Sequence, residues 1–305
     1  MTLLERKRIP GRGWQTVEAD FGAPSVLNVA SGGNDSTGDP YRTFNAAIQA
    51  AVSLGPAADN RFVVQCMDAA DYNENVVCAP YVDIHAPSAS IVGDGAGILL
   101  LAADHSSVRL FGIRGGDGDG DPDRIMAIGK IEGTSQSYVD VREIILGDYA
   151  IGAINYGENA KLMVNIGLLQ VGDNSFGVGA DAAAPSAGHI HAEVGDIYVG
   201  ASSAGLIAAN AGSIVSRLDH ILPVPSGATG AVGVYVATTT GYVSVLATQI
   251  RTDVGLFFTP GSQLNVVCPF ITGTLTGLPA AGASVISDQL VYLPDAPATF
   301  FSVTP

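Results

Sequence analysis

The middle of the chain repeats a short phrase in which apolar residues alternate with polar ones and end on Ile or Leu. The phrases end at residues 145, 169, 197, 221 and 250, in steps of 24, 28, 24 and 29 residues, and no helical period lies between them. A repeat of this length is typical of one coil of a β-solenoid, in which each coil buries its apolar residues by stacking on its neighbours. The five phrases are Val139–Ile145, Met163–Leu169, Ala192–Ile197, Val215–Ile221 and Val245–Ile250.

One segment near the N-terminus follows the period of an amphipathic helix instead. Four apolar residues recur at the i, i+3, i+4 and i+7 positions of one helical face, and Gly55-Pro56 follows as a stop signal. We expect a helix over about residues 41–53. The open end of a solenoid exposes strand edges and an apolar core, so this helix is predicted to cap the N-terminal end. Its apolar face consists of Phe44, Ala47, Ile48 and Ala51.

These patterns divide the chain into three parts. Residues 1–24 are predicted to be an extended basic arm, and residues 25–275 to be the solenoid with its capping helix. Residues 276–305 open with a linker-like run of Pro, Ala and Gly and then become apolar. We expect this last part to form a C-terminal tail or cap.

The charge is distributed unevenly between the arm and the solenoid. The chain carries 14 basic and 29 acidic residues, for a net charge of −15. This balance argues against nucleic acid as a partner, because the phosphates would be repelled. Four basic residues nevertheless stand near the N-terminus, so the arm is either a solvated terminus or an anchor on an acidic surface. They are Arg6, Lys7, Arg8 and Arg12.

The sequence predicts no signal peptide and no transmembrane segment. Pro10-Gly11-Arg12-Gly13 follows the basic residues where a secretory signal has its apolar core. The longest apolar run, Ile98–Ala103, is far shorter than the roughly 20 residues of a membrane span. The three cysteines have neither CxxC spacing nor a disulfide framework, and we expect buried free thiols from a reducing cytosol.

A run of turn residues, the predicted helix and the strands that follow resemble the opening of pectin-lyase-like right-handed parallel β-helix proteins. The resemblance implies an all-β fold, a single-stranded right-handed parallel β-helix. The family includes pectin-degrading enzymes, other polysaccharide lyases and hydrolases, bacteriophage tailspikes and other virion proteins. Its virion members also imply a homotrimer. The matching residues are Gly33, Asn34, Asp35, Gly38, Pro40, Tyr41, Thr43, Ala47, Ile48, Ala51, Tyr72, Glu74, Asn75, Val76, Ile91 and Gly93.

Carboxylates are the first candidates for chemistry, because cleavage of a glycosidic bond normally needs two of them about 5 to 10 Å apart. Glu143, Glu193 and Asp219 occupy nearby points of successive repeats and would line one face. In the other interpretation they are solvated positions between inward-facing apolar residues. No GxSxG, HExxH, Walker or GxGxxG motif indicates a different chemistry. The opening segment adds Asp68, Asp71 and Glu74 as further candidates.

Residues 115–123 alternate Gly and Asp and form the first candidate metal site. Hard carboxylate oxygens on a flexible backbone suit Ca²⁺. The loop departs from the EF-hand pattern, because the twelfth position counted from its first Asp is Ile128 rather than Glu. A solvated excursion from the solenoid is the alternative. The candidate ligands are Asp117, Asp119 and Asp121.

A second metal pattern is His189-x-His191, which places two imidazoles on one side of a strand. Glu193 continues that side and would be the third ligand. The set suggests Zn²⁺ or Ni²⁺, including an ion on a threefold axis. The alternative is a row of polar residues on an exposed face.

Three functional hypotheses follow. The first is a non-enzymatic structural protein of a tailed bacteriophage virion: a trimeric β-helix attached to the particle by its basic arm, as a capsid decoration (cement) protein. The second is a tailspike or receptor-binding protein that binds or cleaves host surface polysaccharide. The third is a free polysaccharide lyase or hydrolase. We expect the first, with the major capsid protein or another virion protein as partner, no cofactor, synthesis in the host cytoplasm and a final location on the virion surface.

Overall fold

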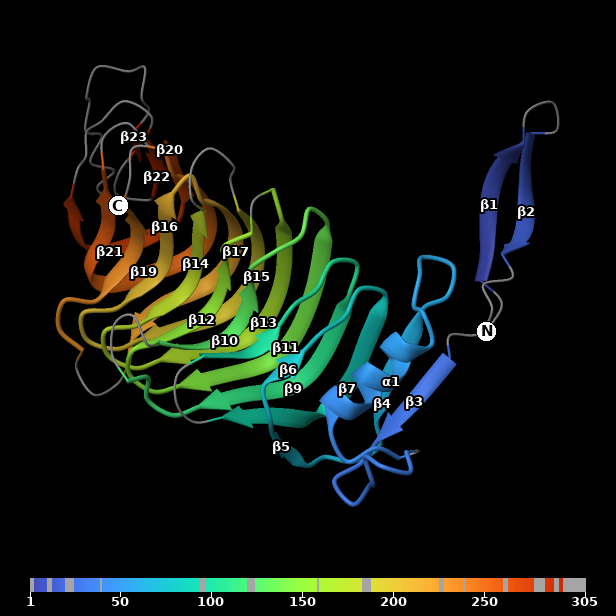
Figure 1. Ribbon diagram of the computed structural model, residues 1–305. Helices are drawn as coiled ribbons and strands as arrows, with labels where there is room; N and C mark the ends of the chain where they lie inside the picture. Colours follow the sequence, from blue (N-terminus) through green and yellow to red (C-terminus); the bar gives the residue numbers. More distant parts are fainter. Residues whose placement is uncertain are drawn as a thin grey trace.

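The protein is a parallel β-solenoid of about seven full turns, with 64% of its residues in strands. Figure 1 shows the computed structural model, with a capping helix at one end of the stack and β21 to β23 at the other. The fold prediction is confirmed. The structure describes residues 3–9, 13–19, 25–38, 40–93, 97–119, 124–157, 159–182, 188–224, 228–237, 240–259, 263–276, 283–287 and 291–292.

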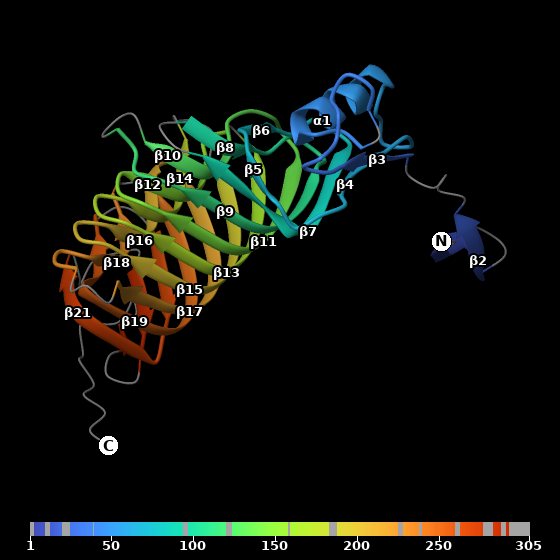
Figure 2. The same cartoon turned by 90° about the horizontal axis from the view of Figure 1, so that it is seen from below.

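Each full turn consists of a long strand that bends near its middle and a shorter strand. In Figure 2 the long strands lie side by side in chain order. The long strands are β7 (Val82–Gly93), β9 (Ser107–Gly115), β11 (Gln136–Leu146), β13 (Lys161–Val171), β15 (His189–Val199), β17 (Ser213–Pro223) and β19 (Tyr242–Phe258). The shorter ones are β8 (Gly97–Leu101), β10 (Ile125–Lys130), β12 (Ala150–Asn155), β14 (Phe176–Ala182), β16 (Ala204–Asn210) and β18 (Val232–Val236). The C-terminal half of β19 serves as the short strand of its own turn, since it pairs with β18.

The bend in the long strands follows from their hydrophobic pattern. In β11 the buried residues alternate up to Val141, skip one position, and resume at Ile144. The skip turns the second half of the strand onto a new face while keeping its apolar side inside. Every turn therefore contributes to three parallel ladders: the first from the first halves of the long strands, the second from their second halves, and the third from the short strands.

The repeat predicted from the sequence forms the inner row of the second ladder. Leu169, Ile197, Ile221 and Ile250 are in register and fully buried, as predicted. The predicted end of the first repeat, Ile145, lies one residue beyond the position that is in register with the other four repeats. Ile144 is level with Leu169, whereas Ile145 is level with Gln170 and partly exposed. Two adjacent isoleucines left the end of that phrase ambiguous in the sequence.

The predicted capping helix is α1 (Phe44–Ser53), and all four residues of its predicted apolar face are fully buried. It begins at residue 44 rather than 41, because Thr43 is the N-cap and accepts a hydrogen bond from the N–H of Ala46 through Oγ1 (3.2 Å). The Asp35 carboxylate also accepts hydrogen bonds from the N–H groups of Arg42 and Thr43, which holds both residues outside the helix.

Shorter strands complete both ends of the stack. β3 (Ser25–Val29) pairs with β4 (Phe62–Cys66), and β5 (Asp71–Asn73) and β6 (Val76–Val77) begin the second and third ladders. At the other end lie β20 (Gln263–Val267), β21 (Phe270–Thr276), β22 (Ala283–Ile286) and β23 (Val291–Tyr292). β22 pairs in parallel with β20, so the first ladder continues past residue 275, where the solenoid was expected to end.

The basic arm contains two strands, β1 (Leu3–Ile9) and β2 (Gly13–Ala19), which form an antiparallel pair separate from the large sheet. Arg6, Lys7 and Arg8 belong to β1, and Arg12 lies outside the described residues. Among the residues that the structure describes, no helix is long and apolar enough to cross a membrane.

Candidate functional site

The three predicted catalytic carboxylates lie in different rows of the solenoid. Glu143 begins the second half of β11, and its Oε1 accepts a hydrogen bond from Arg114 Nη2 (2.7 Å). Glu193 is exposed on the first ladder, level with Asn165 and Arg217. Asp219 is exposed two residues beyond Arg217. No two of the three occupy neighbouring positions of one row, so the structure does not assemble them as the repeat suggested.

Polar side chains follow one outward row of the first ladder from coil to coil. Arg109 forms an ion pair with Asp140 (Nε to Oδ2, 3.2 Å), and Asn165 donates a hydrogen bond to Asp140 (3.0 Å). We call this set the polar row. Such exposed pairs contribute little to stability, so the row is available for contacts with solvent or a ligand. Its members, in register, are Gln65, His85, Arg109, Asp140, Asn165, Glu193 and Arg217.

The two histidines of the predicted metal site are exposed on β15, beside the polar row. His189 is level with Lys161, and His191 with Met163. Together they line a hollow of about 250 Å³. The described part of the chain contains no group of three or more His, Cys, Asp or Glu placed to hold a metal ion. A metal bound by these histidines therefore stays a prediction, and in one copy of the chain it lacks a third ligand from the described residues.

The Asp-Gly loop has a structural role at its first aspartate. Asp117 accepts a hydrogen bond from the N–H of Asp148 in the next coil (3.0 Å). The carboxylate of Asp148 accepts one from the N–H of Asp173 (2.7 Å), and that of Asp173 accepts one from the N–H of Ala201 (2.6 Å). We call Asp117, Asp148 and Asp173 the aspartate ladder. Its signal in the sequence is a Gly-Asp pair at the same corner of successive coils.

The other loop aspartates do not join this ladder. Asp119 is exposed, and Asp121 lies outside the described residues. Calcium binding by this loop stays a prediction. Because Asp117 already accepts a backbone hydrogen bond, any ion would share that carboxylate with the coil above.

The residues that carry the family resemblance hold the capping helix on the stack. Both carboxylate oxygens of Glu74 accept hydrogen bonds from the first helical N–H groups, those of Phe44 (2.7 Å) and Asn45 (3.1 Å). Burial raises the pKa of Glu74 above its ordinary value. Asn45 in turn accepts a hydrogen bond from the N–H of Val77. The first helical turn is thereby tied to the turn between β5 and β6, so Glu74 has a capping role rather than a catalytic one.

Asp68 holds the other side of this end. Its carboxylate accepts hydrogen bonds from Tyr72 Oη and from the N–H of Ser31, both at 2.7 Å. Partial burial acts to raise the pKa of Asp68, but the hydrogen bonds outweigh it and lower the pKa to about 2. Cys66 lies beside this pair as a free thiol and is only partly buried, so its predicted burial is wrong, whereas the predicted burial of Cys78 and Cys268 is confirmed.

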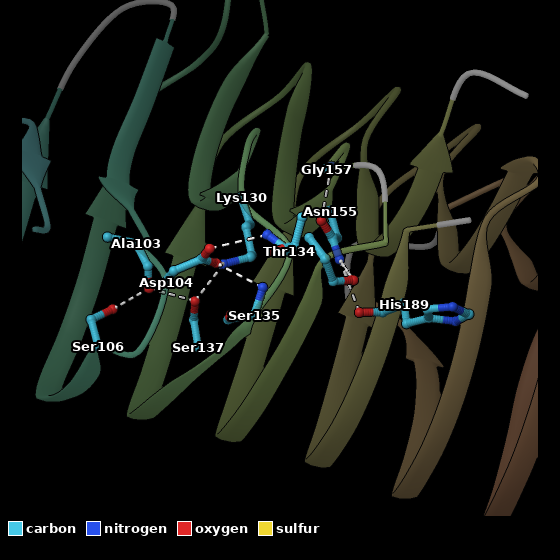
Figure 3. A network of polar contacts seen from close by, with 11 residues as sticks. Ala103, Asp104, Ser106, Lys130, Thr134, Ser135, Ser137, Asn155, Gly157 and His189 are labelled. Atoms are coloured by element: carbon cyan, nitrogen blue, oxygen red, sulfur yellow. Dashed lines mark hydrogen bonds and ion pairs between the residues drawn. The ribbon is translucent and has the colours of Figure 1, made fainter. Parts of the chain in front are cut away.

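A lysine that no sequence pattern singles out is buried inside the solenoid (Figure 3). The Lys130 side chain is 0% exposed, and its Nζ donates to Asp104 Oδ1 and to Ser137 Oγ, each at 2.7 Å. Asp104 also accepts hydrogen bonds from the N–H groups of Thr134 and Ser135. Partial burial acts to raise the pKa of Asp104, but the hydrogen bond from Lys130 and those from the backbone lower it below its ordinary value.

A lysine and a serine at this distance resemble a nucleophilic pair, but their surroundings indicate a structural role. Ser137 is 1% exposed, and its hydroxyl donates to the carbonyl of Ala103 (2.6 Å). A hollow of about 420 Å³ reaches Asp104 but is not lined by Lys130 or Ser137. One coil further on, the equivalent position is Asn155, whose side-chain amide donates to the backbone carbonyls of Ala160 and His189. This row of the third ladder therefore connects neighbouring coils.

Two outward rows of the third ladder are apolar, and we together call them the apolar face. Asp181 of β14 is partly exposed beside them. The first row is Ile98, Met126, Ile151, Phe176, Ala204, Val232 and Val254. The second is Val77, Leu101, Gly129, Ile154, Gly179, Ile207, Tyr235 and Phe257. Most members are partly exposed, and Ile151, Ile154 and Ala204 are buried without belonging to the central core.

The centre of the apolar face is hollowed. Ile154, Phe176 and Ile207 surround Gly179, and together these residues line a hollow of about 240 Å³. The guanidinium of Arg124 stacks on the Phe176 ring at 4.7 Å, at one edge of the hollow. Apolar walls with polar groups at the rim are typical of binding surfaces.

The architecture is consistent with the pectin-lyase-like β-helix fold that the opening segment resembles. Comparison with known proteins adds no closer assignment: no protein-family model, curated protein or solved structure matches the chain.

Proposed function

We propose that the chain is a non-enzymatic structural protein of a tailed bacteriophage virion, attached to the particle surface as a capsid decoration protein. The observation that carries this proposal is that several acidic side chains stabilise the fold through hydrogen bonds and an ion pair. Asp117 binds the backbone of the next coil, Glu74 caps the helix, and Asp104 neutralises a buried lysine. Carboxylates that would be candidates for chemistry instead support a rigid rod, and the function of a rod depends on where it is attached.

The basic arm supports attachment to an acidic particle surface. Arg6, Lys7 and Arg8 follow one another in β1, which belongs to a sheet of its own, while the chain as a whole carries a net charge of −15. A positively charged segment on an acidic protein is suited to an acidic partner that the rest of the chain would repel.

Charge removal at two places tests this role. The arm variant is Arg6→Gln/Lys7→Gln/Arg8→Gln, and the matched control is Arg109→Gln/Lys161→Gln/Arg217→Gln, which removes three exposed charges from the solenoid. We expect the arm variant to lose co-sedimentation with particles that lack the protein, and the control to retain it. Particles without the protein should also rupture at a lower temperature. Equal binding by both variants, together with unchanged rupture, would refute the proposal.

A tailspike that binds host surface polysaccharide is the second candidate, and the polar row favours it. Its hydrogen-bonding groups recur on successive coils from β4 to β17, beside the hollow at His189 and His191. The same two variants separate the candidates. If the protein binds glycan through this row, the solenoid variant loses binding on a glycan array while the arm variant keeps it. An array without any wild-type binding excludes this alternative.

A further inference from the structure

The apolar face differs from every other outward surface of the solenoid that the structure describes. Its two rows contain no charged residue, and Tyr235 is the one member with a polar group. An antiparallel or parallel sheet that faces water alternates apolar and polar positions, as the first ladder does along the polar row. Here both sides of the strands are apolar, which is the pattern of a sheet covered on both faces.

We propose that the apolar face is where a second copy of this chain binds. This deepens the structural role proposed above, on which it rests, by naming the surface and the partner. The surface chemistry favours another copy over a highly charged macromolecule, because neither row carries a charge and the hollow is flanked by a single cation and a single carboxylate, Arg124 and Asp181. The two rows contribute nothing to the net charge of −15, so two copies that meet there bring only the Asp181 carboxylate at the rim of the hollow near the interface.

The footprint of the face approaches that of a stable interface. The second row spans eight rungs from Val77 to Phe257, which at ~4.8 Å per rung is roughly 34 Å. Five residues along each short strand add a width of roughly 17 Å, or about 600 Å² per copy. Specific interfaces bury about 800 Å² per partner, so this face supplies most of the required area, and the residues at its rim supply the rest.

The relief of the face offers a place for a partner side chain. Leu101 and Ile207 are partly exposed on the second row, Ile154 is buried, and the Ile98 side chain covers Gly129, so the hollow at Gly179 is the main recess. A second copy has the same repeat distance between its rungs. One of its aliphatic side chains can therefore enter the hollow over Gly179, and its neighbours then meet the adjacent rungs at the same spacing.

The test is the oligomeric state of the purified full-length chain, without any particle, measured by sedimentation at micromolar concentration. We expect the wild type to associate and Ile207→Glu to weaken association by about tenfold or more, because a carboxylate would be buried in the interface. The matched control is Val215→Glu, which places the same group at an outward apolar position on the first ladder. It should associate like the wild type.

A cysteine variant keeps the test decisive if Ile207→Glu fails to fold. Ile207→Cys should cross-link two copies under mild oxidation, and Val215→Cys should not. A monomeric wild type, or equal effects of the Ile207 and Val215 variants, would overturn the inference. Because no particle is present, an oligomer that fails to bind particles would refute the proposed function and leave this inference standing.

Discussion

At the scale of single residues, hydrogen bonds and ion pairs between positions far apart in the sequence connect the coils, and no local pattern predicts them. Lys130 illustrates this, since its ammonium group is surrounded by the solenoid and depends on Asp104 and Ser137 for all its described partners. Replacing both members of a buried ion pair by apolar residues is often neutral, whereas removing one partner leaves an uncompensated charge. The Lys130 network therefore specifies how adjacent coils are placed more than it raises stability.

The two members of this pair should differ in their sensitivity to mutation. Asp104→Ala leaves the fully buried Lys130 without its counter-ion, and we expect a loss of about 3–5 kcal/mol in the free energy of unfolding. Lys130→Met leaves Asp104 with two backbone N–H donors and partial exposure, so the loss should be clearly smaller. Chemical denaturation measures both, and a greater loss for Lys130→Met would contradict this account.

Asp68 should make the stability of the N-terminal end depend on pH. Its folded-state pKa of about 2 lies below the ordinary value of 3.8. The contribution of Asp68 to the free energy of unfolding is therefore complete above the ordinary pKa and is lost as the pH falls toward about 2. Asp68→Asn should be less stable than the wild type at neutral pH and should lose less further stability between pH 4 and 2. Parallel curves of melting temperature against pH for the two proteins would show that Asp68 has no such role.

At the scale of elements, the capping helix covers an end of the solenoid that would otherwise expose unpaired strand edges to other chains. Both hydrogen-bonding oxygens of Glu74 serve the first turn of α1, and the apolar side of the helix is completely buried. An uncovered solenoid end presents strand edges that other chains can extend. The helix thus serves solubility as well as stability.

Glu74→Ala tests both roles. Two helical N–H groups lose their acceptor, for which we expect a cost of about 1–2 kcal/mol, together with earlier aggregation on heating. Gln49→Ala is the control, because Gln49 is exposed on the same helix. Thermal unfolding followed by light scattering measures the two effects, and identical behaviour of the two variants would contradict the capping role.

The sequence predicted those elements whose signal is local. The buried side of helix α1 and the inner row of the second ladder both follow a short period in the sequence, and both predictions were confirmed. Lys130 and Asp104 stand 26 residues apart, and no spacing rule connects them. The apolar face was also missed: every residue of β12 from Ala150 to Asn155 is buried, so its pattern does not tell inside from outside.

At the scale of the whole molecule, the protein has chemically distinct sides. The polar row follows the first ladder, the apolar face follows the third, and positive charge is concentrated in the arm. Each side is suited to a different kind of contact. The arm would bind through charge, the apolar face through exclusion of water, and the polar row through hydrogen bonds.

Salt should separate two of these contacts. The Debye length falls from about 10 Å at 0.1 M to about 3 Å at 1 M ionic strength. Binding of the arm to particles should therefore weaken with added salt, whereas association through the apolar face should be unchanged or stronger. Co-sedimentation with particles and sedimentation of the free protein, each over a salt series, measure the two. Oligomers that dissociate in high salt would show that charge, rather than the apolar face, holds them together.

The aspartate ladder has a consequence for how the length of the solenoid can change in evolution or be engineered. Because Asp117, Asp148 and Asp173 occupy equivalent corners and bind the same backbone group above them, the coils are interchangeable modules. Excision of residues 147–171 would join Leu146 to Gly172, bring Asp117 under Asp173, and set β14 on β10. The shortened rod would keep its cap and its arm, so the reach of the protein is adjustable one coil at a time.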